Sequence, residues 1–186
     1  MRHAFDSLTR RAARFALCSI AALVVGAPAA VTQAQEPLSE ARLKAALLAN
    51  LALFIDWAAA AGPLRMCVAG RGDTAEAARA LDGKQLKNRA VEIVVVAAPA
   101  GVTGRGCHLL FITAATGARA VEYAQAAAGN PTLIVSEDDA LSLERSHIVI
   151  ALDEERRPVI EVNLTAARRL GLDISSRMLK LARKVL

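Results

Sequence analysis

Short apolar runs alternate with segments of helical spacing along most of this chain of 186 residues. The predicted strands are 64–69, 91–96, 107–113, 132–135, 147–152 and 157–162, and the main predicted helices are 39–57, 73–81 and 117–128. The strands are mostly continuous apolar runs rather than strict alternations of apolar and polar residues, which is typical of a sheet covered on both faces. This order predicts an α/β fold, a three-layer sandwich with a mostly parallel sheet and helices on both faces.

The end of the chain adds a hairpin and two short helices to this plan. Four polar residues, 153–156, separate the last two predicted strands and suit a hairpin turn, so we expect an antiparallel hairpin at one edge of the sheet. After it, Asn163 can cap a first helix, and Gly171 can end that helix because glycine tolerates a positive φ. Ser175 or Ser176 can cap a second, basic helix that continues toward the C-terminus.

The first 34 residues have the parts of a secretory signal peptide. Arginines precede an apolar run, 15–25, which is shorter than the roughly 20 residues of a transmembrane helix, and small residues follow it. We therefore predict a signal peptide over 1–34 and a single periplasmic domain over 35–186. Four of the 23 basic and one of the 18 acidic side chains lie in the first segment, so the mature chain keeps 19 and 17 and a formal charge of +2. Nucleic acid is not an expected partner for so small a charge.

One glycine-containing turn could hold an anion. It follows a predicted strand, opens a predicted helix and consists of Gly70, Arg71, Gly72, Asp73 and Thr74. The spacing resembles a relaxed dinucleotide fingerprint, but the end of the next predicted strand carries no acidic residue. We therefore expect no dinucleotide there, and a small anion held by the backbone N–H groups is the alternative.

No pattern typical of catalysis or metal binding occurs in the chain. His108 and His147 lie in different predicted strands, and neither an H-x-x-x-H nor a C-x-x-C pattern is present. His108 follows Cys107, but neighbours along a strand point to opposite faces of the sheet, so the two do not form a dyad. We expect structural or surface histidines, no metal, no cofactor and no enzymatic activity.

The run from Ile160 to Ala182, I-E-V-N-L-x-A-A-R-R-x-G-L-x-I-S-S-x-x-L-K-L-A, resembles the C-terminal signature of the YfiR family of periplasmic proteins. Further segments follow in the order of that family: Ala46 to Trp57, Leu64 to Gly70, Leu81 to Lys84, Gly106 to Ile112, and Thr132 to Glu137. Two positions depart from the family's pattern. Ala58 stands where proline is usual, and 145–148 replaces a Gly-Gly-x-Ile entry.

The resemblance implies a periplasmic regulator, often dimeric, that restrains an inner-membrane diguanylate cyclase by binding its periplasmic sensor domain. It also implies that an outer-membrane lipoprotein can sequester the regulator, and a sensor kinase is the other candidate partner. Regulators of this kind act through exposed apolar patches, which makes Trp57, Leu164 and Arg168 the candidate partner surface. The simpler interpretation of Trp57 is that it closes the first helix onto the core.

Cys67 and Cys107 are the two cysteines that follow the predicted signal peptide, and each lies early in a predicted strand. If the sheet has the doubly wound order 2-1-3, these strands are parallel neighbours about 4.8 Å apart. That spacing falls within the roughly 4.4–6.8 Å between Cα atoms that a disulfide requires. We predict a disulfide, and two buried thiols packed as small apolar groups are the alternative.

Overall fold

The computed structural model describes residues 39–57, 62–137 and 140–186, so the predicted signal peptide and Ala58 lie outside the described residues. In chain order the elements are α1 (Glu40–Leu53), β1 (Ile55–Asp56), β2 (Leu64–Ala69), α2 (Asp73–Arg79), β3 (Gln85–Leu86), β4 (Arg89–Val96), the 3₁₀ helix η1 (Pro99–Gly101), β5 (Leu109–Ile112), η2 (Ala114–Arg119), α3 (Ala120–Ala127), β6 (Leu133–Glu137), η3 (Leu143–Arg145), β7 (Ile148–Leu152), β8 (Pro158–Val162), α4 (Leu164–Arg169), β9 (Asp173–Ile174), α5 (Ser176–Leu179) and β10 (Lys184–Val185).

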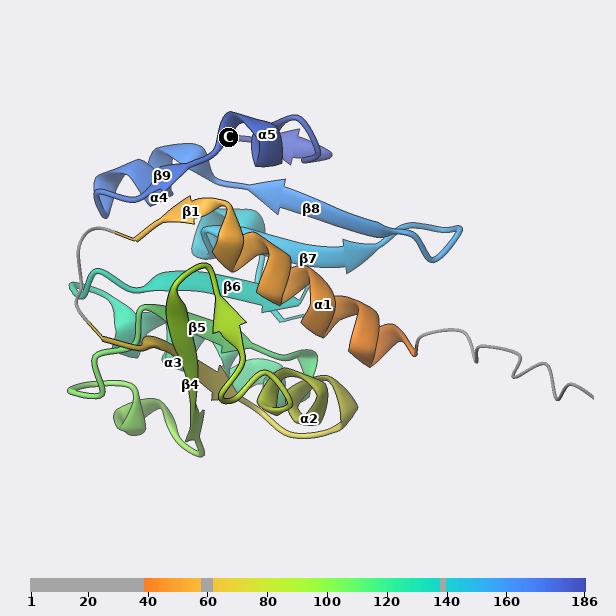
Figure 1. Cartoon of the computed structure of the whole chain (residues 1–186). Helices are drawn as coiled ribbons and strands as arrows, with labels where there is room; N and C mark the ends of the chain where they lie inside the picture. The colour runs from red at the N-terminus through yellow and green to blue at the C-terminus, as the bar shows by residue number, and fades with distance from the viewer. Residues whose placement is uncertain (1–38, 58–61, 138–139) are drawn as a thin grey trace, which may run out of the picture. The chain divides into compact units, whose positions relative to one another are not determined.

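The main sheet has the strand order β10-β8-β7-β6-β5-β2-β4-β3 (Figure 1). Strands β4, β2, β5, β6 and β7 are parallel, whereas β7 and β8 form the expected antiparallel hairpin. The α/β fold class is therefore confirmed. The doubly wound order is confirmed as well, since β2 lies between β4 and β5.

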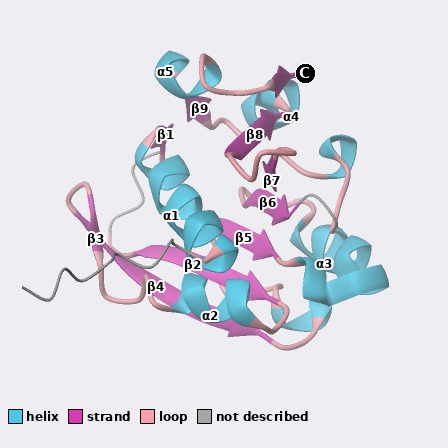
Figure 2. Cartoon of the chain, turned by 90° about the vertical axis from the view of Figure 1, so that its right-hand side faces the viewer, coloured by secondary structure: helices cyan, strands magenta, loops and turns pink. Residues whose placement is uncertain are grey.

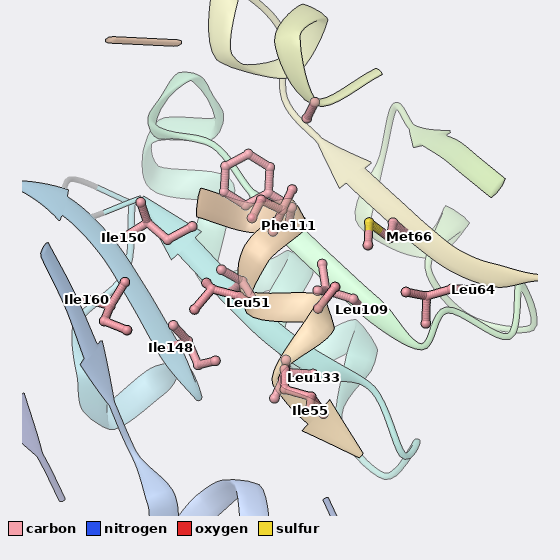
Figure 3. Close-up of a cluster of buried hydrophobic side chains, with 14 of the residues drawn as sticks. Leu51, Ile55, Leu64, Met66, Leu109, Phe111, Leu133, Ile148, Ile150 and Ile160 are labelled. Carbon is pink, nitrogen blue, oxygen red and sulfur yellow. The ribbon is translucent and has the colours of Figure 1, made fainter. Parts of the chain in front are cut away.

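Alternate residues of β2, β5 and β6 face two separate hydrophobic clusters. Met66 and Val68 of β2 belong to the cluster covered by α1 and α2, whereas Cys67 and Ala69 belong to the cluster covered by α3. Figure 2 shows the helices on the two sides of the sheet. Figure 3 shows the larger cluster, in which Leu51 of α1 lies among the side chains of the central strands. This alternation explains why the strands are apolar throughout.

The first predicted helix is too long by several residues. Helix α1 ends at Leu53, and Ile55 and Asp56 form β1, which pairs with Ile174 and Asp173 of β9 in a separate two-stranded sheet. The apolar spacing of 54–55 fits a helix equally well. The partner strand is more than 100 residues away, so local periodicity gave no sign of it.

The prediction of a basic helix that continues toward the C-terminus is also wrong beyond the first turn. Helix α5 spans Ser176–Leu179, and the chain then extends so that Lys184 and Val185 pair with Glu161 and Val162 of β8. Pairing with the exposed edge of β8 satisfies backbone groups that a frayed helix end would leave to solvent. Residues 136–137 belong to β6, and Gly72 is the N-cap residue of α2.

Candidate functional site

Two adjoining pockets lie along the edge of the sheet at which strands β5, β6 and β7 begin. One has a volume of about 460 Å³, and its lining includes Trp57, Cys107, His108 and Leu172. The other has a volume of about 440 Å³ and is lined by α3, Arg145 and His147. Asn130, Thr132 and Leu170 line both pockets. We call the two pockets together the amino-edge groove.

Two histidines in this groove make the same pair of hydrogen bonds to a neighbouring strand. The His108 N–H donates to the carbonyl of Arg65 at 2.9 Å, and the Arg65 N–H donates to Nδ1 of His108 at 3.0 Å. The His147 N–H donates to the carbonyl of Ile134 at 3.0 Å, and the Ile134 N–H donates to Nδ1 of His147 at 2.8 Å. Each imidazole therefore satisfies a backbone N–H at the start of the ladder, which fixes both rings in place.

Both imidazoles are held in the neutral form. Burial lowers the pKa of His147 to about 4. Burial lowers the pKa of His108 as well, and the positive charges of Arg89 and Arg65 lower it further. Because Nδ1 of His147 accepts a hydrogen bond, the proton of that neutral ring sits on Nε2, whereas Nε2 of His108 lies 3.4 Å from Nη2 of Arg89. A second proton on Nδ1 of His147 would point at the backbone N–H of Ile134, so two donors would face each other.

Trp57 closes α1 and lines the groove at the same time. Its indole N–H donates to the carbonyl of Ala52 at 2.9 Å, and its ring meets the His108 ring edge-on with centroids 6.4 Å apart. Leu164 packs partly buried against the larger core cluster, and Arg168 is exposed. The structure therefore does not bring Leu164 and Arg168 into the groove beside Trp57.

The turn that ends α4 contributes Leu170 and Leu172 to the groove. Gly171, with φ of 72°, ends the helix as expected. Its N–H donates to the carbonyl of Arg168, and the next N–H donates to that of Ala167, which is a Schellman motif. This turn lets Leu170 and Leu172 both line the groove. Each of the two groove histidines follows a small residue and precedes an apolar run, at Cys107-His108 and Ser146-His147. This shared pattern is the sequence signal by which they could have been found.

A disulfide between Cys67 and Cys107 lies beside the groove, with the two Cα atoms 5.7 Å apart. The pairing agrees with the prediction, but the local geometry differs from it. Strand β5 begins at Leu109, so Cys107 precedes the strand, and the register partner of Cys67 is Leu110. The segment before β5 turns at Gly104 and Gly106, whose φ angles are 77° and 62°. This turn returns Cys107 to the face on which Cys67 points.

The turn at Gly70–Thr74 lies at the opposite, carboxyl edge of the sheet, and a carboxylate of the chain itself meets it. Oε1 of Glu137 accepts hydrogen bonds from the Thr74 hydroxyl at 3.2 Å and from Lys44 Nζ at 2.9 Å. Oε2 accepts one from the Ala114 N–H at 2.7 Å. Gly70 has φ of 105°, and an added Cβ would collide with the Thr113 hydroxyl. Arg71 and Asp73 are exposed, and an external anion at this turn stays a prediction.

The Lys44–Glu137 ion pair is almost fully buried, and Glu40 also contacts Lys44 at 2.8 Å. Burial opposes the charge of Lys44, but the hydrogen bonds to Glu40 and Glu137 outweigh it and raise its pKa. The hydrogen bond from Lys44 is the main reason that the pKa of Glu40 is lowered. At the edge where open α/β sheets commonly bind ligands, this chain therefore holds an internal ion pair.

Within residues 39–57, 62–137 and 140–186, no group of three or more histidine, cysteine or acidic side chains is placed to hold a metal ion. None of the helices in these ranges has the length and apolar character needed to cross a membrane.

A family model described as YfiR/HmsC-like matches residues 41–183. No curated protein matches the chain. Among solved structures, the chain is similar to the ABC domain in complex with L-Trp from Streptococcus pneumoniae, with 12% identity, a TM-score of 0.53, and coverage of 79% of this chain and 60% of that one. It is also similar to a conserved domain protein from Vibrio cholerae, with 14% identity, a TM-score of 0.51, and coverage of 80% and 61%. At these identities the likeness shows the fold alone, and this chain spans about three fifths of each structure's length.

Proposed function

Because the chain belongs to the YfiR/HmsC-like family, we propose that it is a non-enzymatic regulatory protein of the periplasm. In this proposal it restrains an inner-membrane sensor, a diguanylate cyclase or a kinase, by binding the periplasmic part of that sensor. The observation that carries the proposal is the family match over residues 41–183, which extends from α1 to the last residues before β10. Secretion through a signal peptide over 1–34, sequestration by an outer-membrane lipoprotein and homodimer formation belong to the same proposal.

The groups in the amino-edge groove support binding rather than chemistry. Both imidazoles use Nδ1 to accept a backbone N–H, so neither offers that atom as a general base. The two cysteines of the described chain are joined in a disulfide and cannot act as nucleophiles. The remaining lining is largely aliphatic or backbone, which suits the burial of a partner's apolar side chains.

Capture from solubilised membranes, combined with measurement of the cyclic-di-GMP level, tests this function. We expect the purified protein to retain a cyclase encoded near it, and its expression to lower the cyclic-di-GMP of cells that carry that cyclase. Retention of a sensor kinase with unchanged cyclic-di-GMP would select the kinase. A ligand-induced rise in melting temperature without any retained membrane protein would contradict the proposal and favour the small-anion site at Gly70–Thr74.

A further inference from the structure

We propose that the amino-edge groove receives an extended acidic segment of the partner protein, which places one apolar side chain in each pocket. This inference rests on the proposed function and adds to it the surface and the chemistry of the segment. It follows from three features of the described chain: the shape and lining of the groove, the charges around it, and the position of the exposed apolar residues.

The two pockets are apolar hollows of a size suited to bulky side chains. Their volumes, about 460 and 440 Å³, lie within the range of roughly 300–1,000 Å³ that is typical of ligand pockets. Pro131 and Leu172 line the first, Val121 and Ala124 line the second, and Leu170 lines both. A ligand that fills both pockets needs two apolar groups joined by a linker. An extended peptide has this form, because residues two apart project from the same face.

Four exposed arginines either line the groove or lie within two residues, in sequence, of a residue that lines it. Arg145 lines the second pocket, Arg105 lies between two glycines that line the first, and Arg168 and Arg169 directly precede Leu170. None of the four forms an ion pair with another described residue, whereas most other arginines do. Arg145 therefore gives the second pocket a positive charge, which an acidic segment complements.

Two carboxylates are adjacent in sequence to residues that line the groove, but their side chains face away from it. Asp56 and Asp173 are register partners in β1 and β9, next to Trp57 and Leu172. Because side chains alternate along a strand, Asp56 and Asp173 line a separate hollow with Lys87. Two other exposed carboxylates are adjacent in sequence to lining residues: Glu122, which pairs with Arg119, and Glu144, which stands beside Arg145.

The recessed position of the apolar groups favours a protein segment over a membrane surface. A membrane-binding face presents protruding apolar side chains that enter the lipid. The large apolar side chains that protrude from the described chain are Val95, Leu181, Val185 and Leu186, and none of them lines the groove. The groove is built to receive side chains rather than to insert them.

Fluorescence polarisation with two labelled decapeptides tests the inference. The first peptide carries aspartate and glutamate around one leucine and one phenylalanine placed two residues apart, and in the second every acidic residue is replaced by lysine. We expect the mature wild-type protein to bind the acidic peptide only, and about 0.5 M NaCl to weaken the binding. Arg145→Glu and Arg168→Glu should each raise Kd about fivefold, which corresponds to about 1 kcal/mol.

Two further variants separate the effects of charge and of pocket shape on Kd from an effect on folding. Arg42 is an exposed arginine of α1 that lines neither pocket, so Arg42→Glu should leave Kd within about twofold. Ala128 is exposed and lines the second pocket, so Ala128→Trp should fill it and raise Kd at unchanged melting temperature. Equal binding of the lysine peptide, no binding of either peptide, or an equal effect of Arg42→Glu would overturn the inference.

Two more measurements separate this inference from its rivals. Binding of the wild-type protein to phosphatidylglycerol vesicles, lost in Arg145→Glu, would make the surface a membrane surface and overturn the inference. Restraint of the cyclase by wild type, lost in Arg145→Glu, would support it. If the variant no longer binds the acidic peptide but still restrains the cyclase, the groove is not the docking site and the proposed regulation stands. If wild type does not restrain the cyclase, the proposed function fails whatever the peptides show.

Discussion

The substitution His147→Asn should remove most of the dependence of stability on mildly acidic pH. Nδ1 of His147 accepts the Ile134 N–H at 2.8 Å, and burial lowers the pKa of the ring to about 4 from its ordinary 6.5. Oδ1 of an asparagine occupies nearly the same position relative to the backbone as Nδ1 does, so it can accept the same hydrogen bond. Asparagine cannot take up a proton in this range, and the variant therefore separates the hydrogen bond from the titration.

The sign and size of the effect follow from the two pKa values. Between pH 6.5 and pH 4 the unfolded chain binds more protons at this residue than the folded chain does, so stability rises with pH. The contribution is fully present above pH 6.5 and is lost as the pH falls. Taken at full value, these pKa values give a loss of about 2 kcal/mol between pH 7.5 and pH 5. Because part of the ring is in contact with solvent, we expect about 1–2 kcal/mol.

Urea denaturation of wild type and variant at both pH values measures this loss. The wild type should lose about 1–2 kcal/mol more between pH 7.5 and pH 5 than His147→Asn does. His108, whose pKa is lowered as well, leaves a smaller residual slope in the variant. The control His147→Phe removes both the acceptor and the titration, so it should be about 1–3 kcal/mol less stable than His147→Asn at both pH values. Equal slopes in wild type and His147→Asn, or a His147 nitrogen titration midpoint near 6.5 by NMR, would refute the reasoning.

Three other outcomes are expected. Reduction of the Cys67–Cys107 disulfide, which spans 40 residues, should lower stability by about 4 kcal/mol in the chain-entropy model, and mass spectrometry of freshly purified, unreduced protein should find no alkylatable thiol. Lys44→Met should lower the free energy of unfolding by about 3–5 kcal/mol, because it leaves the buried Glu137 carboxylate without this cation. Adding Glu137→Gln should recover part of the loss, and no recovery in the double variant would contradict this account. N-terminal sequencing of exported protein should find residues 1–34 absent, and an intact Met1 on a membrane-bound form would refute the signal peptide.

Local patterns in the sequence predicted most of the main elements and the sheet that they form. The apolar runs of β2, β4, β5, β6, β7 and β8 were all recognisable, because a strand buried on both faces has no polar alternation to conceal it. Two helix caps were recognisable from residue type: the side chains of Asn163 and Ser175 accept backbone N–H groups as expected. The disulfide could be inferred only as one of two alternatives, because its geometry depended on a strand order that was itself an inference.

Short pairings and the candidate site required the tertiary structure. Strands β1, β9 and β10 have two residues each, and they exist because distant segments pair with them rather than because of their own periodicity. The groove brings together Trp57, His108, His147 and Leu170, which are distributed over more than 110 residues of sequence. Leu170 and Leu172 line the groove although no sequence pattern singled them out, whereas Leu164 and Arg168 lie outside its lining and stay a predicted partner surface.

The buried segments could be predicted from the chain alone, because a buried segment has a local pattern of apolar residues. The tertiary structure alone decided which ends of the strands meet and which side chains converge there. The carboxyl edge holds the internal Lys44–Glu137 pair, and the amino edge holds the open groove with its two neutral histidines. Contacts between residues far apart in the chain depend on strand order and register, and neither is encoded within any one segment.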